Sequence, residues 1–281
     1  MRIGDVTIRL VGDGLIWSDG GGAFGLVPRI RWERVIAPNA LGQIPMRTDS
    51  LLIESEGKRI LVDTGYGEKL SEVELAALSL SGDRLPTSLA GAGVRPDQID
   101  IVINTHLHAD HAGGNTRLCD GKVVPTFPKA EYWIQRLEVA DARYPNERTR
   151  ATYLAGNFVP LEESDQLHLV LGDARVTSEV GCLSTPGHTR GHQSVLIESA
   201  GHKALFLGDL STLAIGMERI AWVTAYDVDP MQTIETKRRI CRWAVDEKIL
   251  LIFMHDPKMR AGYLREKDGR LTLEPVEIMA S

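Results

Sequence analysis

The segment NTHLHADHAGGN, residues 104–115, places three of the chain's eight histidines within six positions. Its four metal-binding residue types form an HxHxDH pattern: His106, His108, Asp110 and His111. A chain of this composition would contain that pattern by chance in fewer than about one case in a thousand. Imidazole nitrogens and carboxylate oxygens are ligands for zinc and other divalent ions. One ion could not easily take all four side chains from so short a segment, so we expect two neighbouring ions.

Three distant residues can complete such a site. His188 lies in a Pro-Gly turn within STPGHTRGH, Asp209 follows the apolar run ALFLG, and His255 follows ILLIFM. A lone polar residue at a strand end is more often structural, but here three accompany a strong motif. Ligands in open α/β sheets bind at such strand ends. We therefore predict seven metal ligands: His106, His108, Asp110, His111, His188, Asp209 and His255.

The remaining histidines are expected to have other roles. His192 is a candidate hydrogen-bond partner behind the ligands, whereas His168 and His202 are expected at the surface. Gly208 precedes Asp209 and would allow close approach of the backbone. Gly113 and Gly114 would let the chain turn away after the motif.

Strands must bring these residues together, and hydrophobic patterning places them. Expected strands span 3–11, 50–55, 59–63, 99–105, 166–171, 174–180, 193–199, 203–208, the start of 248–257, and 270–278. Expected helices span 68–80 and 231–247. The segment 17–46 shows little periodicity and is expected to be a long functional loop. Two successive sets of strands and helices without a linker predict a single domain over 1–281, built from two similar halves.

The composition bounds the class of protein. A formal net charge of −6 and the lack of a long basic run argue against nucleic acid or an anionic membrane as partner. No segment has the length and apolarity of a transmembrane helix, and the N-terminus lacks a signal-peptide pattern. The three cysteines, far apart and odd in number, are typical of a reducing compartment. We expect a cytoplasmic protein, with a homodimer possible and a small molecule as its partner.

The motifs THLHADH, TPGHTRGH, FLGD and MHDP, in this order, resemble those of metallo-β-lactamase-fold hydrolases, and LVDTG with Asp63 matches a further element of that superfamily. The resemblance spans about 48–258 and implies an α/β fold, a four-layer αββα sandwich with a dinuclear metal site at one edge of the sheets. It implies that one ion is held by His106, His108 and His188 and the other by Asp110, His111 and His255. Asp209 would bridge them, and Asp63 would orient a ligand through hydrogen bonds.

A finer resemblance concerns the substrate. Residues 19–35, DGGGAFGLVPRIRWERV, followed by RTDSLLIE, resemble YtnP-type quorum-quenching lactonases, relatives of the N-acyl homoserine lactonases. Related segments also occur in methyl-parathion-hydrolase-like proteins. The best-known homoserine lactonases carry a tyrosine three residues after the bridging aspartate, and this chain has Thr212 there. The role of that tyrosine does not carry over.

The expected function is a metal-dependent hydrolase in which a hydroxide bridging two divalent ions opens a lactone or ester. Zinc suits the ligands, and iron, manganese or cobalt would also fit. Asp209 would hold both ions and Asp110 would transfer the proton to the leaving oxygen. Phe24, Leu26 and Val27 could form an apolar wall for an acyl chain, or Trp17 and Trp32 could serve as core or dimer contacts.

Other functions remain open. An organophosphate triesterase would use the same hydroxide against phosphorus. A thioester hydrolase is less favoured because the C-terminal segment lacks a basic cluster. A metal-binding effector without catalysis is argued against by the complete ligand set, and a flavodiiron-type oxidoreductase by His108, where those enzymes carry a carboxylate.

Overall fold

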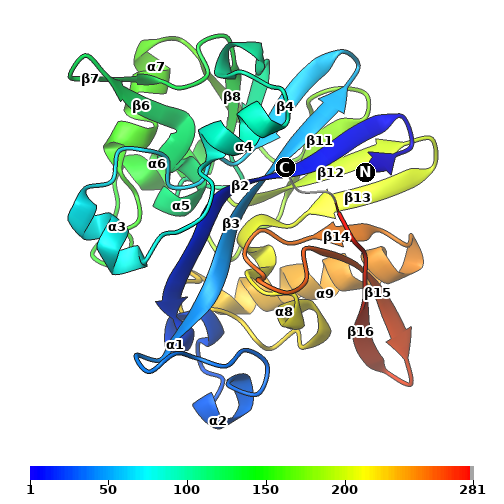
Figure 1. Ribbon diagram of the computed structural model, residues 1–281. Coiled ribbons are helices and arrows are strands. Elements are labelled where there is room, and N and C mark those ends of the chain that lie inside the picture. Colours follow the sequence, from blue (N-terminus) through cyan, green and yellow to red (C-terminus); the bar gives the residue numbers. More distant parts are fainter. Residues whose placement is uncertain (279–281) are drawn as a thin grey trace.

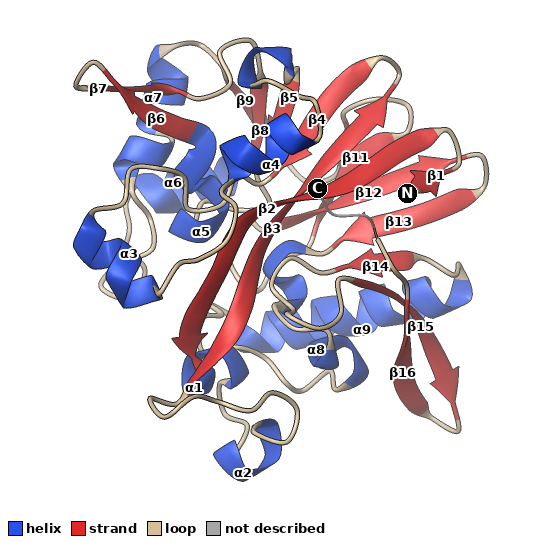
Figure 2. Ribbon diagram, in the orientation of Figure 1, coloured by secondary structure: helices blue, strands red, loops and turns tan. Residues whose placement is uncertain are grey.

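The computed structural model describes residues 1–278, and its main feature is a pair of seven-stranded sheets with helices outside them (Figures 1 and 2). The first sheet contains, in order, β1 (Arg2–Ile3), β2 (Val6–Asp19), β3 (Gln43–Ser55), β4 (Lys58–Val62), β5 (Ile101–Ile103), β8 (Glu131–Gln135) and β9 (Leu167–Val170). The second contains β10 (Ala174–Arg175), β11 (Val180–Ser184), β12 (Gln193–Ser199), β13 (His202–Phe206), β14 (Leu250–Ile252), β15 (Ala261–Lys267) and β16 (Arg270–Pro275). A separate hairpin joins β6 (Thr116–Cys119) and β7 (Lys122–Pro125).

The helices are mostly short. The α-helices are α1 (Gly20–Phe24), α2 (Arg29–Trp32), α3 (Glu72–Leu78), α4 (Leu85–Gly91), α5 (Ala109–Ala112), α6 (Arg136–Arg143), α7 (Val159–Glu163), α8 (Ile215–Glu218) and α9 (Pro230–Asp246). The 3-10 helices are η1 (Pro96–Gln98), η2 (Gly113–Asn115), η3 (Ala155–Asn157) and η4 (Gly208–Ser211). Among residues 1–278, no helix combines the length and apolarity needed to cross a membrane.

The inner faces of the two sheets share one apolar core. Ile8 and Ile53 of the first sheet belong to the same buried cluster as Val195 and Phe206 of the second. Alternate side chains of a strand point to opposite faces, so each strand can contribute to this core and to the layer outside it. The two sheets therefore bury their inner faces against each other.

Helices cover the outer faces. Leu89 of α4 and Val139 of α6 pack in a cluster with Leu61 of the first sheet, and Ile240 of α9 packs with Leu251 of the second. The layers are therefore helix, sheet, sheet and helix, which confirms the predicted αββα sandwich.

The topology puts several strand ends at one edge. β4, β5 and β8 pair in parallel in the first sheet, and β13 pairs in parallel with β14 in the second. Asp63 follows β4, His106 lies three residues beyond β5, Asp209 follows β13, and His255 lies three residues beyond β14. Parallel strands place these segments at a common edge.

The prediction of an irregular loop over 17–46 is wrong. β2 continues to Asp19 and pairs with β3 from Gln43, so the two strands form a long arm with α1 and α2 at its far end (Figure 1). The strand expected over 3–11 ends before Gly12-Asp13-Gly14 because that composition is typical of a turn, but in the structure this segment is only an irregularity in the register of β2 with β3. Asp13 is buried there and accepts hydrogen bonds from Arg84 Nε at 3.0 Å and from the Leu85 N–H at 2.9 Å.

Other boundaries differ locally. The strand expected over 174–180 is only β10, because the N–H groups of Val176 and Thr177 both donate to the Val180 carbonyl and close a turn before β11. The helix expected over 68–80 is the shorter α3, which begins at the Ser71–Glu74 capping box. The strands β6, β7, β8 and β15, and β11 beyond Val180, were not anticipated from the sequence.

The shared core predicts a large cost for truncating a side chain between the sheets. Leu51→Ala removes a fully buried side chain, so the free energy of unfolding should fall by about 2–5 kcal/mol in a denaturant titration. Leu171→Ala is the matched control because Leu171 is 65% exposed, and its effect should stay within about 0.5 kcal/mol. Equal effects of the two substitutions would contradict the assignment of Leu51 to the core.

Candidate metal centre

The seven predicted ligands converge at the common edge of the sheets. Three groups of side chains each bring their ligand atoms within 4.8 Å of one another. These groups are His106–His108–His188, His106–His111–Asp209 and Asp110–His111–His255. Every one of the residues predicted from sequence is therefore in the cluster.

Asp209 lies between the two ends of this cluster. Its Oδ2 is 3.3 Å from His188 Nε2, whereas its Oδ1 is 3.2 Å from His255 Nε2 and 3.6 Å from His111 Nε2. Asp110 Oδ2 is 3.7 Å from the Nε2 atoms of both His111 and His255. The two oxygens of Asp209 thus face different sets of histidines.

The imidazole contacts need a positive charge between them. His111 Nε2 and His255 Nε2 are 3.2 Å apart. The other nitrogen of His111 is 2.9 Å from an Asp63 carboxylate oxygen, and that of His255 is 2.6 Å from the Arg47 carbonyl. Both acceptors require an N–H on the facing Nδ1, which leaves a lone pair on each Nε2. Two facing lone pairs repel, so a shared proton or a metal ion must lie between them.

Buried atoms without a hydrogen-bond partner give the same indication. Within residues 1–278 these atoms include Asp209 Oδ1, which faces His111 and His255, and His106 Nε2, at the other end of the cluster. His188 Nε2 faces His108 Nδ1 at 3.1 Å. Buried polar atoms are rarely left without partners, and exceptions commonly mark an ion or a function. The donor set therefore fits divalent metal ions.

The pKa values of the histidines in the cluster are shifted in opposite directions. Burial, reinforced by neighbouring imidazoles, lowers the pKa of His106 and His108 well below the usual range. Burial also opposes a charge on His111, but Asp110, Asp209 and Asp63 outweigh it and raise the pKa of His111 well above the usual value. The carboxylates around His111 therefore favour a positive charge there, and a metal ion would supply it.

Asp63 orients the HxHxDH segment. Besides contacting His111 Nδ1, its carboxylate accepts hydrogen bonds from the Thr105 N–H and hydroxyl, both at 2.8 Å. It is fully buried and has a positive φ of 58°. These contacts agree with the expectation that Asp63 orients a histidine of the motif through hydrogen bonds.

His192 supports Asp209 through the backbone. The Asp209 N–H donates to His192 Nε2 at 3.0 Å, and burial lowers the pKa of His192 to about 3, so the ring remains a neutral acceptor. Gly208 must be glycine because its φ is +55° and a Cβ there would lie 2.8 Å from His192 Nε2. His168 and His202 are exposed, as expected.

Two supporting carboxylates were missed from the sequence. Asp227 Oδ1 is 2.8 Å from His188 Nδ1. Glu138, on α6, accepts hydrogen bonds from the Leu107 N–H at 2.9 Å and from the Thr189 hydroxyl at 2.6 Å. Neither residue has a local sequence signal, because only the fold brings it to the ligand segments.

Glu138 ties three segments together. A third hydrogen bond comes from the Tyr153 hydroxyl at 2.8 Å, and the Tyr153 ring lies 5.1 Å from the His108 ring. The carboxylate is fully buried, and burial raises its pKa although the three hydrogen bonds oppose that shift.

The cluster opens to solvent beside Asp110. This residue is the most exposed of the seven predicted ligands, with 25% of its side chain accessible.

Phe24 and Trp32 belong to a buried aromatic cluster. Phe24 is stacked on Trp32 at 5.3 Å and lies edge-on to Trp222 at 5.9 Å. Trp32 is therefore a core contact, one of its two expected roles, and Leu26 is fully exposed.

The fold and the buried His/Asp cluster define a metal-dependent hydrolase class. The sequence profile of the Metallo-beta-lactamase superfamily matches residues 44–242, and the chain belongs to that superfamily. It is 29% identical over 223 residues to an N-acyl homoserine lactonase of Bacillus cereus, covering 75% of this chain and 82% of that protein.

Two solved structures extend the comparison to the whole chain. A probable metal-dependent hydrolase from Staphylococcus aureus superposes with a TM-score of 0.90 at 29% identity and full coverage of both chains. AidC, a dizinc quorum-quenching lactonase in complex with a product, superposes with a TM-score of 0.80 at 21% identity, covering 99% of this chain and 97% of AidC. At that identity the second likeness shows the fold.

The Glu138 contacts predict a loss of both stability and metal affinity on truncation. Glu138→Ala leaves the Leu107 N–H and two hydroxyls without their acceptor, so the free energy of unfolding should fall by about 1–3 kcal/mol. Metal affinity, measured by chelator competition, should fall about 10–100-fold. Glu138→Gln is the matched control, because its amide keeps an acceptor and the Thr189 hydroxyl can reverse. Wild-type metal affinity in the alanine variant would refute this role.

Proposed function

We propose that this protein is a dinuclear metal-dependent hydrolase that opens lactones or esters, with N-acyl homoserine lactones as the preferred class. The observation that carries the proposal is the position of Asp209, whose two oxygens face two different sets of imidazoles. The lactonase among the relatives supports the substrate class.

In the proposed site, His106, His108 and His188 would hold one ion, and Asp110, His111 and His255 would hold the other. Asp209, whose two oxygens face both sets of imidazoles, would belong to both. Zinc is the preferred metal because the donors are five imidazoles and two carboxylates. Iron, manganese and cobalt remain compatible with the same donors. The dizinc centre of a protein with the same fold agrees with this choice.

When bound, two divalent ions supply Lewis acidity and lower the pKa of a water toward roughly 7, which makes a hydroxide available for attack. Asp63, Asp227 and the Arg47 carbonyl keep His111, His188 and His255 in the orientation that directs their free nitrogens inward. Asp110 is the predicted ligand most accessible to solvent. In the proposed mechanism its carboxylate would take up the proton of the attacking water and deliver it to the leaving oxygen.

Removal of the metal should abolish hydrolysis reversibly. Chelator-treated wild-type protein should lose lactone hydrolysis and regain it on addition of a divalent ion. Asp209→Ala should lose at least about 100-fold in kcat/KM and not recover with added metal, because both ligand sets lose their shared carboxylate. Circular dichroism on the variant checks that it is folded. Full activity of a verified metal-free preparation would disprove the mechanism.

The substrate is tested by a hydrolysis panel on the metal-analysed protein. The panel contains acyl homoserine lactones of several chain lengths, paraoxon-type phosphotriesters and simple aryl esters. The highest kcat/KM should be found with a lactone. A clear preference for the phosphotriesters would instead show that the protein is an organophosphate triesterase.

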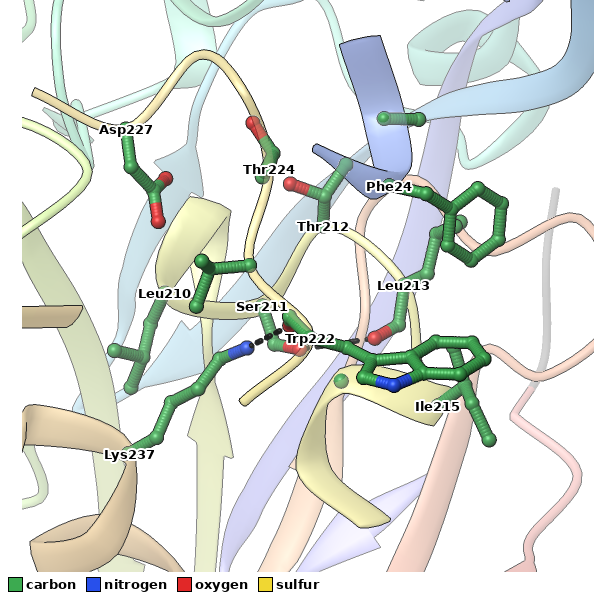
Figure 3. A pocket seen from close by; sticks show the side chains of 13 residues that line it. Phe24, Leu210, Ser211, Thr212, Leu213, Ile215, Trp222, Thr224, Asp227 and Lys237 are labelled. Atoms are coloured by element: carbon green, nitrogen blue, oxygen red, sulfur yellow. Dashed lines mark hydrogen bonds between the residues drawn. The ribbon is translucent and has the colours of Figure 1, made fainter. Parts of the chain in front are cut away.

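Phe24 tests the proposed acyl-chain wall. It lines a cavity that also contains Asp227, the hydrogen-bond partner of His188 (Figure 3). Phe24→Ala should raise KM most for long-chain lactones, because it removes apolar surface near the centre. Leu26→Ala is the control, since that side chain is fully exposed. An unchanged chain-length profile in the Phe24 variant would argue against the wall.

A further inference from the structure

A small cavity beside the metal centre contains polar groups that the proposed mechanism does not use. Thr212, Asp227 and Lys237 line it together with the apolar Phe24 and Trp222 (Figure 3). We call it the Lys237 cavity. Its polar residues come from the position directly after η4, from the loop after α8 and from α9, so it joins three segments of the second half of the chain.

The polar groups of the Lys237 cavity have unused hydrogen-bonding capacity. Asp227 Oδ1 contacts His188 Nδ1 at 2.8 Å, but Asp227 Oδ2 is buried and has no partner within residues 1–278. The Thr212 hydroxyl is likewise buried and has no hydrogen-bond partner among those residues. Lys237 Nζ donates to the Trp222 carbonyl at 2.8 Å, which accounts for one of its three N–H groups.

The burial of Lys237 makes this arrangement unusual. Its side chain is only 2% exposed, although a lysine is almost never fully buried without a partner. Burial lowers the pKa of Lys237 to about 8, and the nearby charge of Asp227 acts in the opposite direction. The carboxylate therefore stabilises the ammonium from across the cavity, although no direct hydrogen bond joins the two among the described residues.

The free groups of the Lys237 cavity match the hydrogen-bonding capacity of one water molecule. A water there would donate to Asp227 Oδ2 and to the Thr212 hydroxyl and would accept from Lys237 Nζ, and three hydrogen bonds are typical of a buried water. Burial of Asp227 Oδ2 and of the Thr212 hydroxyl without a partner is unfavourable. The cavity has room for a water-sized group.

We propose that an ordered water in the Lys237 cavity connects Lys237 and Thr212 to Asp227, and that Lys237 is thereby a positioning residue for the metal ligand His188. The inference rests on the proposed function, because it takes His188 as a ligand. The ammonium and the water fix the Asp227 carboxylate, which holds the His188 Nδ1–H and directs Nε2 toward Asp209 and His108.

The test measures metal release rather than turnover. Lys237→Met keeps the length of the side chain but removes the donors and the charge. Wild-type and variant proteins are loaded with zinc, and its transfer to a chromogenic chelator is followed with time. We expect one of the two bound ions to leave at least about 10-fold faster in the variant, the effect typical of a lost partner of a metal-bound histidine. Thr212→Val should act in the same direction with a smaller effect.

The control is Arg238→Met, on the same helix. Arg238 is exposed and pairs with Glu235 within α9, so its zinc release should match the wild type. Melting curves of the metal-free proteins report separately on folding. If Lys237→Met lowers the melting temperature but leaves zinc release unchanged, Lys237 is only structural and the proposal is wrong.

A double-mutant cycle tests whether Lys237 acts through Asp227. Asp227→Asn alone should accelerate release at least as much as Lys237→Met, and the double variant should be no faster than Asp227→Asn. Additive effects would show that Lys237 acts by another route and would overturn the proposal. The proposed function fails separately if the wild-type protein binds no metal at all.

Discussion

Two buried imidazole nitrogens, His111 Nε2 and His255 Nε2, face each other at 3.2 Å, while the second nitrogen of each ring is held by Asp63 or by the Arg47 carbonyl. Because both nitrogens are buried, such an arrangement is repulsive unless a cation lies between them. The remainder of the architecture keeps these lone pairs together. The sheets bring the strand ends to one edge. The hydrogen bonds to Asp63 and to the Arg47 carbonyl prevent the two rings from turning away.

The carboxylates that support the cluster through hydrogen bonds come from both halves of the chain. Asp63 comes from the first sheet and holds His111, whereas Asp227 comes from the second half and holds His188. Glu138 connects the two, because it accepts from Leu107 in one half and from Thr189 in the other. The same hydrogen bonds therefore fix the two halves relative to each other and hold the imidazole rings in position. A shift of one half would also displace the rings.

Sequence reasoning could find the seven residues of the cluster because their signals are local. The HxHxDH spacing is dense, and Asp209 and His255 each follow an apolar run that could be recognised as a strand. Glu138 and Asp227 have no such signal, since a carboxylate on a helix or in a loop looks like any solvated residue. The Gly12-Asp13-Gly14 segment was misinterpreted for a related reason. Its turn-like composition serves a buried contact with Arg84, which is distant in sequence.

The arm formed by β2 and β3 carries Phe24 toward the centre but contributes none of the seven ligands. Its tip meets the second half of the chain where the Ala225 N–H donates to the Gly22 carbonyl at 2.9 Å. The seven side chains of the cluster and the tip of the arm are thus separate parts of the polypeptide. Substitutions at the tip can change the surroundings of the cluster without replacing any of its seven side chains. The fold therefore allows the two parts to vary independently in sequence.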